Sequence, residues 1–115
     1  MGRRHRQREK LAAPASEYRD PDAGALVLRG ALTPATRREY AAVLAGGTHQ
    51  EDAWQRGVEF LFEHLAVSWT IAGVATTRQR ELLGRLRLAT PGERRFVREA
   101  IRAHVAEHFP ELPAP

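Results

Sequence analysis

Apolar residues recur with helical spacing along much of the chain. The longest such stripe consists of Trp54, Val58, Leu61, Leu65, Trp69 and Ala72. Its members advance by steps of four, three, four, four and three residues, which places all of them on one face of an α-helix. Shorter stripes follow in residues 79–88 and 91–108. The pattern therefore predicts amphipathic helices that bury these faces against one another.

Residues with capping chemistry set the boundaries of four predicted helices. Thr33-Pro34 and Thr90-Pro91 each combine an N-cap side chain with proline at the first helical position. The segment 48–51 reads as a capping box, and the segment 76–79 as a weaker one. Glycines after the first two helices and Phe109-Pro110 after the last provide the stops. The predicted helices span about 34–45, 49–72, 77–88 and 91–108.

The N-terminal quarter of the chain is expected to contribute little to the core. Residues 1–24 have little apolar content, and we expect them to form a disordered basic arm. Residues 25–30, A-L-V-L-R-G, have the length and composition of one strand, whose partner would come from residues 12–20 or from another subunit. The predicted fold class is mainly α: a small bundle of about four helices with a short N-terminal β element. One domain would cover residues 25–110, followed by a flexible tail over 111–115.

Composition narrows the possible functions. The chain of 115 residues has no cysteine, which excludes disulfides, thiolate catalysis and cysteine-ligated zinc. The net charge of +4 comes entirely from residues 1–10, whereas residues 76–102 carry eight arginines against three glutamates. The chain has neither a membrane-spanning apolar run nor the apolar core of a secretory signal. We therefore expect a protein of the cytoplasm without a membrane partner.

The segment H-V-A-E-H, residues 104–108, matches the His-x-x-Glu-His signature of zinc peptidases. His104 and His108 would project from one face of a helix, as two zinc ligands do. The third ligand of such enzymes lies well downstream, but only seven residues follow His108. A cationic residue near a helix C-terminus is also favoured by the helix dipole. Because the sequence contains no other recognisable catalytic motif, we predict no metal, no cofactor and no catalytic residue.

The arginine-rich region defines an alternative function. Arg94, Arg95 and Arg98 follow the start of the last predicted helix, and Arg78 lies at the start of the one before it. Two helices joined by a short turn loosely match a helix-turn-helix layout, in which the second helix enters a DNA groove. Glutamates interleave with these arginines, and the helix has no Asn or Gln to read bases. A small DNA-binding regulator using residues 78–102 remains the alternative, and a helical adaptor of unknown partner is a third reading.

A brief extended segment with Arg29, Leu32 and Thr33 precedes a helix with Glu39, and the long aromatic-rich segment W-Q-R-G-V-E-F-L-F-E-H-L-A-V-S-W follows. Over residues 25–110 this layout resembles the tail assembly chaperones of long-tailed phages with non-contractile tails. The resemblance implies a small, mostly helical, non-catalytic protein of the host cytoplasm that is absent from the finished virion. Such chaperones bind the tape measure protein and keep it soluble while tail tube subunits polymerise around it.

A chaperone for helical clients needs apolar surface that it does not bury itself. The aromatic side chains of the long predicted helix are spread over more than one of its faces, so one face of a small bundle would stay open. The predicted client-binding residues are Trp54, Phe60, Phe62 and Trp69. An amphipathic client helix would lie along them, and the alternative is that they belong to the core. Self-association is a further expected contact, and nucleic acid is the less favoured partner.

Overall fold

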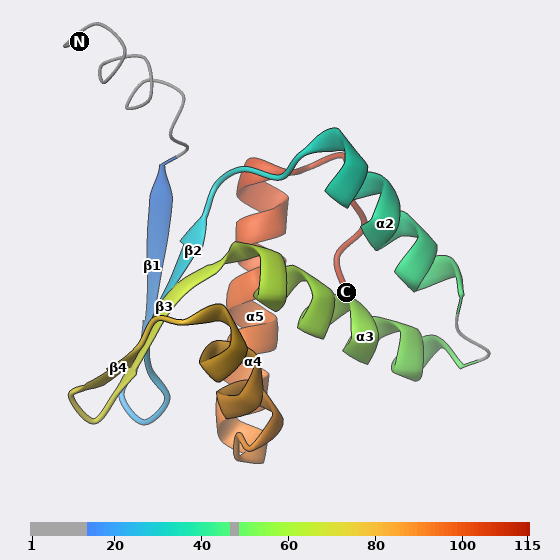
Figure 1. The fold of residues 1–115 in the computed structure, drawn as a ribbon. Coiled ribbons are helices and arrows are strands. Elements are labelled where there is room, and N and C mark those ends of the chain that lie inside the picture. Colours follow the sequence, from blue (N-terminus) through green and yellow to red (C-terminus); the bar gives the residue numbers. More distant parts are fainter. Residues whose placement is uncertain (1–13, 47–48) are drawn as a thin grey trace, which may run out of the picture.

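The computed structural model describes residues 14–46 and 49–115, which form two layers (Figure 1). One layer is a four-stranded antiparallel sheet, and the helices lie on one side of it. Helices α3, α4 and α5 contact the sheet, and α2 packs on α3. The predicted mainly α bundle is therefore wrong, and the fold is α+β. No helix in these residues combines the length and apolar character that crossing a membrane requires.

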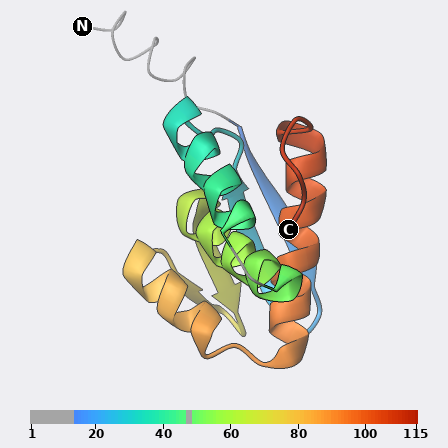
Figure 2. The same ribbon diagram turned by 90° about the vertical axis from the view of Figure 1, so that its right-hand side faces the viewer.

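The sheet has its strands in chain order, with a helical pair inserted in the middle. The elements are β1 (Ala15–Asp20), β2 (Gly24–Arg29), α2 (Pro34–Ala45), α3 (Gln50–Leu65), β3 (Ala66–Ile71), β4 (Val74–Thr76), α4 (Gln79–Arg87) and α5 (Pro91–His108). The helical pair α2–α3 connects the two central strands, β2 and β3. Figure 2 shows α5 running along one side of the helical layer and α4 lying on the other side of α3.

The predicted strand at residues 25–30 is confirmed as β2, and one of its two predicted partners is the correct one. Strand β1 pairs with it inside this chain, with Tyr18 opposite Leu26. Residues 15–24 therefore form a strand and a tight turn, so the predicted disordered arm does not extend over them. The rest of the predicted arm, residues 1–13, lies outside the described residues.

The long predicted helix of residues 49–72 is wrong in its last third. Helix α3 ends at Leu65, and the residues after it form strand β3 and its turn. The segment V-S-W-T-I is rich in β-branched and aromatic residues, which favour a strand. Ala72 and Gly73 both have positive φ, at 50° and 79°, as in the two-residue turns of tight hairpins. Gly73 thus provides a hairpin turn and not a helix stop.

The core lies between the sheet and helices α3 and α5. Its largest fully buried members are Trp69, Tyr40, Phe62, Phe109, Leu26, Leu28, Leu61, Leu65 and Ile101. Leu26 and Trp69 are paired across β2 and β3, so their side chains share the inner face of the sheet. The helical stripe contributes Leu61 and Leu65 from α3, whereas Trp69 reaches the same core from a strand. Four of the six residues of the stripe, Val58, Leu61, Leu65 and Trp69, therefore belong to the core, whereas Trp54 and Ala72 are exposed and part of the stripe is not helical.

The caps of α2 and α5 are those predicted from the sequence. Thr33 accepts a hydrogen bond from the Thr36 amide, and Thr90 forms a full capping box with Glu93. The weaker box predicted at 76–79 does not form, because α4 begins at Gln79 with Arg78 as its N-cap and no side-chain capping bond. The N-cap of α3 is His49, also without a side-chain bond, and Thr48 lies outside the described residues.

The Thr90 cap leads to a first stability prediction. Thr90→Ala removes the hydroxyl that accepts from the Glu93 amide, and it should lower the free energy of unfolding by about 1 kcal/mol. Urea denaturation followed by circular dichroism measures this change. Thr77→Ala, at an exposed position outside any helix, is the matched control and should be close to neutral. Equal losses for both variants would contradict the assigned cap.

Candidate functional site

A groove lies where α3, the end of α4 and the start of α5 meet. It is lined by Glu51, Gln55, Val58 and Glu59 from α3, by Leu86 and Arg87 from α4, and by Pro91, Arg94, Arg95 and Arg98 from α5. Its volume is about 260 Å³. Sites that enclose a whole small ligand measure roughly 300–1,000 Å³, so this groove is sized for one or two side chains of a larger partner.

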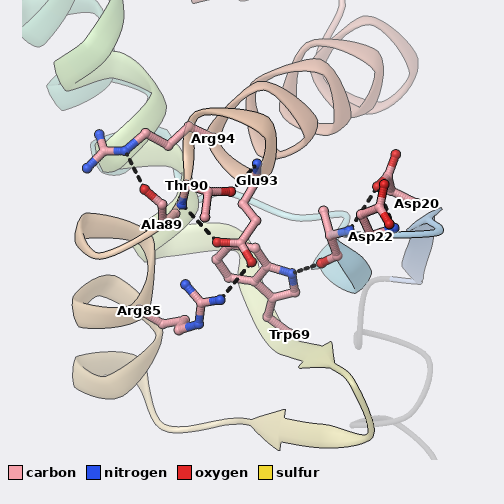
Figure 3. Close-up of polar contacts among 9 residues, drawn as sticks. Asp20, Asp22, Trp69, Arg85, Ala89, Thr90, Glu93 and Arg94 are labelled. Carbon is pink, nitrogen blue, oxygen red and sulfur yellow. Dashed lines mark hydrogen bonds and ion pairs between the residues drawn. The ribbon is translucent and has the colours of Figure 1, made fainter.

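Polar contacts between α4 and α5 fix the geometry of the groove (Figure 3). Arg85 on α4 donates to Glu93 in the first turn of α5 at 2.8 Å. Glu93 also accepts from the Thr90 amide, as its part of the capping box. The hydrogen bond from Arg85 is the main reason that the pKa of Glu93 lies below its usual value, and the bond from the Thr90 amide adds to it. Arg94 donates to the carbonyls of Arg87 and Ala89, so its side chain holds the turn between the two helices.

The same network reaches the sheet through Trp69. The Arg85 guanidinium lies 5.2 Å from the centre of the Trp69 ring, within the range of a cation–π contact. The Trp69 indole N–H donates to the Ala23 carbonyl at 2.8 Å, in the turn between β1 and β2 (Figure 3). Asp20 in turn accepts from the Ala23 amide, which closes that turn. The α4–α5 connection is therefore anchored to a buried aromatic residue and not only to surface charges.

The groove carries more positive than negative charge. Four arginines line it against two glutamates, and of these Arg87 is 3.3 Å from Glu59. The Arg98 guanidinium lies 5.6 Å from the centre of the Trp54 ring. The Nε atom of Arg98 is buried and, within the described part of the chain, makes no hydrogen bond. A buried donor without an acceptor is costly, so this atom lowers the stability of the Arg98 conformation seen here.

The predicted client-binding aromatics do not form one surface. Phe62 and Trp69 are 0 % and 1 % exposed, so they belong to the core and are not available to a partner. Phe60 is half-buried, stacked on Tyr40 and in a tilted contact with His64. Trp54 is 36 % exposed and does not itself line the groove, but its ring centre lies 5.6 Å from the guanidinium of the lining residue Arg98. Of the four predicted aromatics, Trp54 is therefore the one that the structure places beside the candidate site.

The predicted basic residues are partly brought together. Arg94, Arg95 and Arg98 line the groove, as the spacing along α5 suggests. Arg78 is the N-cap of α4 and is not among the lining residues. Sequence reasoning missed Arg87 as a member of the site. Its charge lies in the arginine-rich region, but its position opposite Glu59 depends on how α4 packs against α3.

The two histidines of H-V-A-E-H join α5 to the sheet. His104 is fully buried, and its Nε2 donates to the Arg29 carbonyl at 2.8 Å. Because a carbonyl only accepts, the neutral ring carries its proton on Nε2, and Nδ1 accepts from the Tyr18 hydroxyl at 2.9 Å. His108 Nε2 lies 3.1 Å from the Ser16 hydroxyl. Among residues 14–46 and 49–115, no three His, Asp or Glu side chains are grouped as metal ligands would be.

Burial of His104 makes stability depend on pH. Its pKa is lowered, chiefly by burial and further by His108, although the Arg29 carbonyl and Glu107 oppose the shift. The unfolded chain therefore takes up a proton at higher pH than the folded protein does. In the unfolded chain histidine has a pKa of about 6.5. The stabilising contribution of neutral His104 to the free energy of unfolding is therefore fully present above that pH and is lost as the pH falls below it.

We expect the free energy of unfolding to increase between pH 5 and pH 7.5, and this increase to be smaller in His104→Gln. Urea denaturation at several pH values measures both. His49→Gln, an exposed histidine before α3, is the control and should keep the wild-type dependence. If the free energy of unfolding of His104→Gln rises with pH as steeply as that of the wild type, another group is responsible for the pH dependence.

Comparison with known protein families, with curated protein sequences and with solved structures gives no match to this chain. The fold and the groove therefore define the class of this protein. It is a two-layer α+β protein with a small, partly apolar groove rimmed by arginines.

Proposed function

We propose that this protein is a non-catalytic binding protein whose groove holds an acidic amphipathic helix of a client protein. The observation that carries this proposal is the excess of arginine in a partly apolar groove. Val58, Leu86 and Pro91 are the apolar residues that line the groove together with the charged ones. An amphipathic helix offers the matching arrangement, with apolar anchors along one face and acidic residues beside them.

Two details favour a protein client over a small anion. The groove has room for one or two anchor side chains, and the partly exposed Trp54 lies beside it in contact with Arg98. Arg98 lines the groove, and a glutamate or aspartate of the client would pair with its guanidinium. The lining glutamates, Glu51 and Glu59, disfavour a continuous polyanion such as DNA, whose phosphates they would repel.

The wider role that we propose is assembly chaperone of a long-tailed phage. The support for this role is the sequence resemblance over residues 25–110, and the groove supplies a surface suited to it. The client would then be a helical stretch of the tape measure protein, held in the host cytoplasm until tail tube subunits enclose it.

A peptide titration tests the binding proposal. The probe is a fluorescent amphipathic helix built from Leu and Glu, with a Leu/Lys helix of the same pattern as its control. We expect the anisotropy of the Leu/Glu helix to rise on addition of protein, with affinity that falls as salt increases. Binding of the Leu/Lys helix alone would contradict the proposal. A parallel titration uses a DNA duplex as the probe. An affinity for the duplex that falls steeply with salt would instead support the DNA-binding regulator.

The chaperone role has a separate test. Co-expression with fragments of a tape measure protein encoded beside this gene should keep those fragments soluble and co-purifying. If no tube gene and no long tape measure gene lie beside it, the phage role fails, although the groove proposal stands on its own titration.

A further inference from the structure

The last residues of the chain pack against α2 and α3, at a place formed by Arg37, Tyr40, Leu44 and Gly57, which we term the α2–α3 groove. After α5 the chain turns at Phe109-Pro110 and runs back toward this helical pair (Figures 1 and 2). Residues 113–115 have no regular secondary structure, yet Pro115 is buried. The sequence predicts a flexible tail over 111–115, and the structure instead places it against the helices.

Two polar contacts join this tail to α2, and an apolar residue packs it on the core. Glu111 pairs with Arg37, and the Pro113 carbonyl accepts from the Tyr40 hydroxyl. Leu112 packs against the hydrophobic core. The tail therefore behaves as a bound peptide does, with one ion pair, one backbone hydrogen bond and apolar anchors.

Gly57 on α3 is what makes room for the end of the tail. A Cβ atom at this position would lie 2.9 Å from Leu44 Cδ2 and 3.3 Å from Pro115 Cβ. Tyr40 lies on the other side of the same position, at 3.4 Å. A glycine inside a helix costs stability relative to alanine, so close packing of α2 and the tail is the compensation here.

We propose that the α2–α3 groove is a binding site for extended protein segments of the type acidic-Leu-Pro-x-Pro, and that residues 111–115 are its intramolecular occupant. Arg37 forms an ion pair with the acidic residue, and the Tyr40 hydroxyl donates to the carbonyl of the first proline. Gly57 leaves space for the second proline because it has no side chain. A partner protein that carries such a segment would displace the tail and uncover Tyr40. This site is distinct from the arginine groove between α3 and α5, and it does not rest on the proposed function.

The tail competes strongly with any free segment for the α2–α3 groove. A short tether gives it an effective concentration of the order of millimolar, so a segment in solution competes poorly with it. A test must therefore weaken the tail while leaving the groove unchanged. Leu112→Ser/Pro115→Ser does this in the full-length chain, and Glu111→Lys does it by charge alone, facing Arg37.

The probe is a labelled peptide with the sequence of residues 109–115, and a scrambled peptide is its control. We expect the Leu112→Ser/Pro115→Ser chain to bind the probe about tenfold more tightly than the wild type does, and Glu111→Lys to give about a fivefold gain. Adding Gly57→Val to either variant should abolish the gain, because the side chain fills the place of the proline. If the double variant does not fold, the surface change Glu111→Lys decides the matter. A folded variant that binds no better than wild type, or that binds the scrambled peptide equally, would overturn the proposal.

Discussion

Trp69→Ala is expected to lower the free energy of unfolding by about 3–5 kcal/mol, the range for truncating a fully buried aromatic residue. Trp69 is 1 % exposed and packs edge-to-face on Phe62. Its indole also donates to the Ala23 carbonyl and carries the Arg85 guanidinium over its ring. The substitution leaves a cavity and removes the anchor of both the β1–β2 turn and α4. Urea denaturation followed by circular dichroism measures the loss.

The second tryptophan of the chain is the matched control for this experiment. Trp54 is 36 % exposed and has one face under Arg98, so Trp54→Ala should cost about 1 kcal/mol or less. The comparison tests the position of β3 directly. Similar costs for the two substitutions would mean that Trp69 is not the buried strand residue described here.

Reversing two charges of the groove should have the largest effect on binding. Arg95→Glu/Arg98→Glu replaces two attractive contacts with repulsive ones, and it removes the buried Nε donor of Arg98. Each charge-assisted contact contributes about 1.5–3 kcal/mol, so the affinity for the Leu/Glu helix should fall by a factor of about one hundred or more. Fluorescence anisotropy measures the change, and circular dichroism checks that the variant is folded.

The control for this variant keeps the same change in net charge away from the groove. Arg38 on α2 and Arg80 on α4 are both exposed and do not line it. Arg38→Glu/Arg80→Glu should therefore change the affinity by no more than about threefold, through long-range electrostatics alone. If the two double variants lose affinity equally, net charge and not the groove governs binding.

The sequence predicts best where the chemistry is local. Thr33-Pro34 and Thr90-Pro91 mark their helix starts correctly, because the cap and the proline act within one turn. Phe109 ends α5 for the same kind of reason. Strand β3 is missed, because the helical stripe of α3 happens to continue through Trp69. A strand there depends on its partners β2 and β4, which sequence spacing does not reveal.

The first strand and the groove are harder to predict for a related reason. Strand β1 has few apolar residues, and it is held by pairing with β2 and by the contact of Tyr18 with His104, 86 positions away. The sequence suggests Arg94, Arg95 and Arg98 as a group, because they share one helix. Which aromatic residues stay exposed is decided by tertiary packing, which buries Trp69 between the sheet and the helices and leaves Trp54 partly exposed.

Binding of an acidic amphipathic helix in the arginine groove can be detected at three side-chain N–H groups, those of Trp54, Trp69 and Arg98. In ¹⁵N-labelled protein, the side-chain N–H signals of Trp54, Trp69 and Arg98 are followed by NMR while the Leu/Glu helix is added. We expect the Trp54 and Arg98 Nε signals to shift together and to saturate. The Trp69 signal should stay in place, because its indole N–H is held by Ala23 inside the core. Unmoved Trp54 and Arg98 signals in the presence of bound peptide would contradict the account.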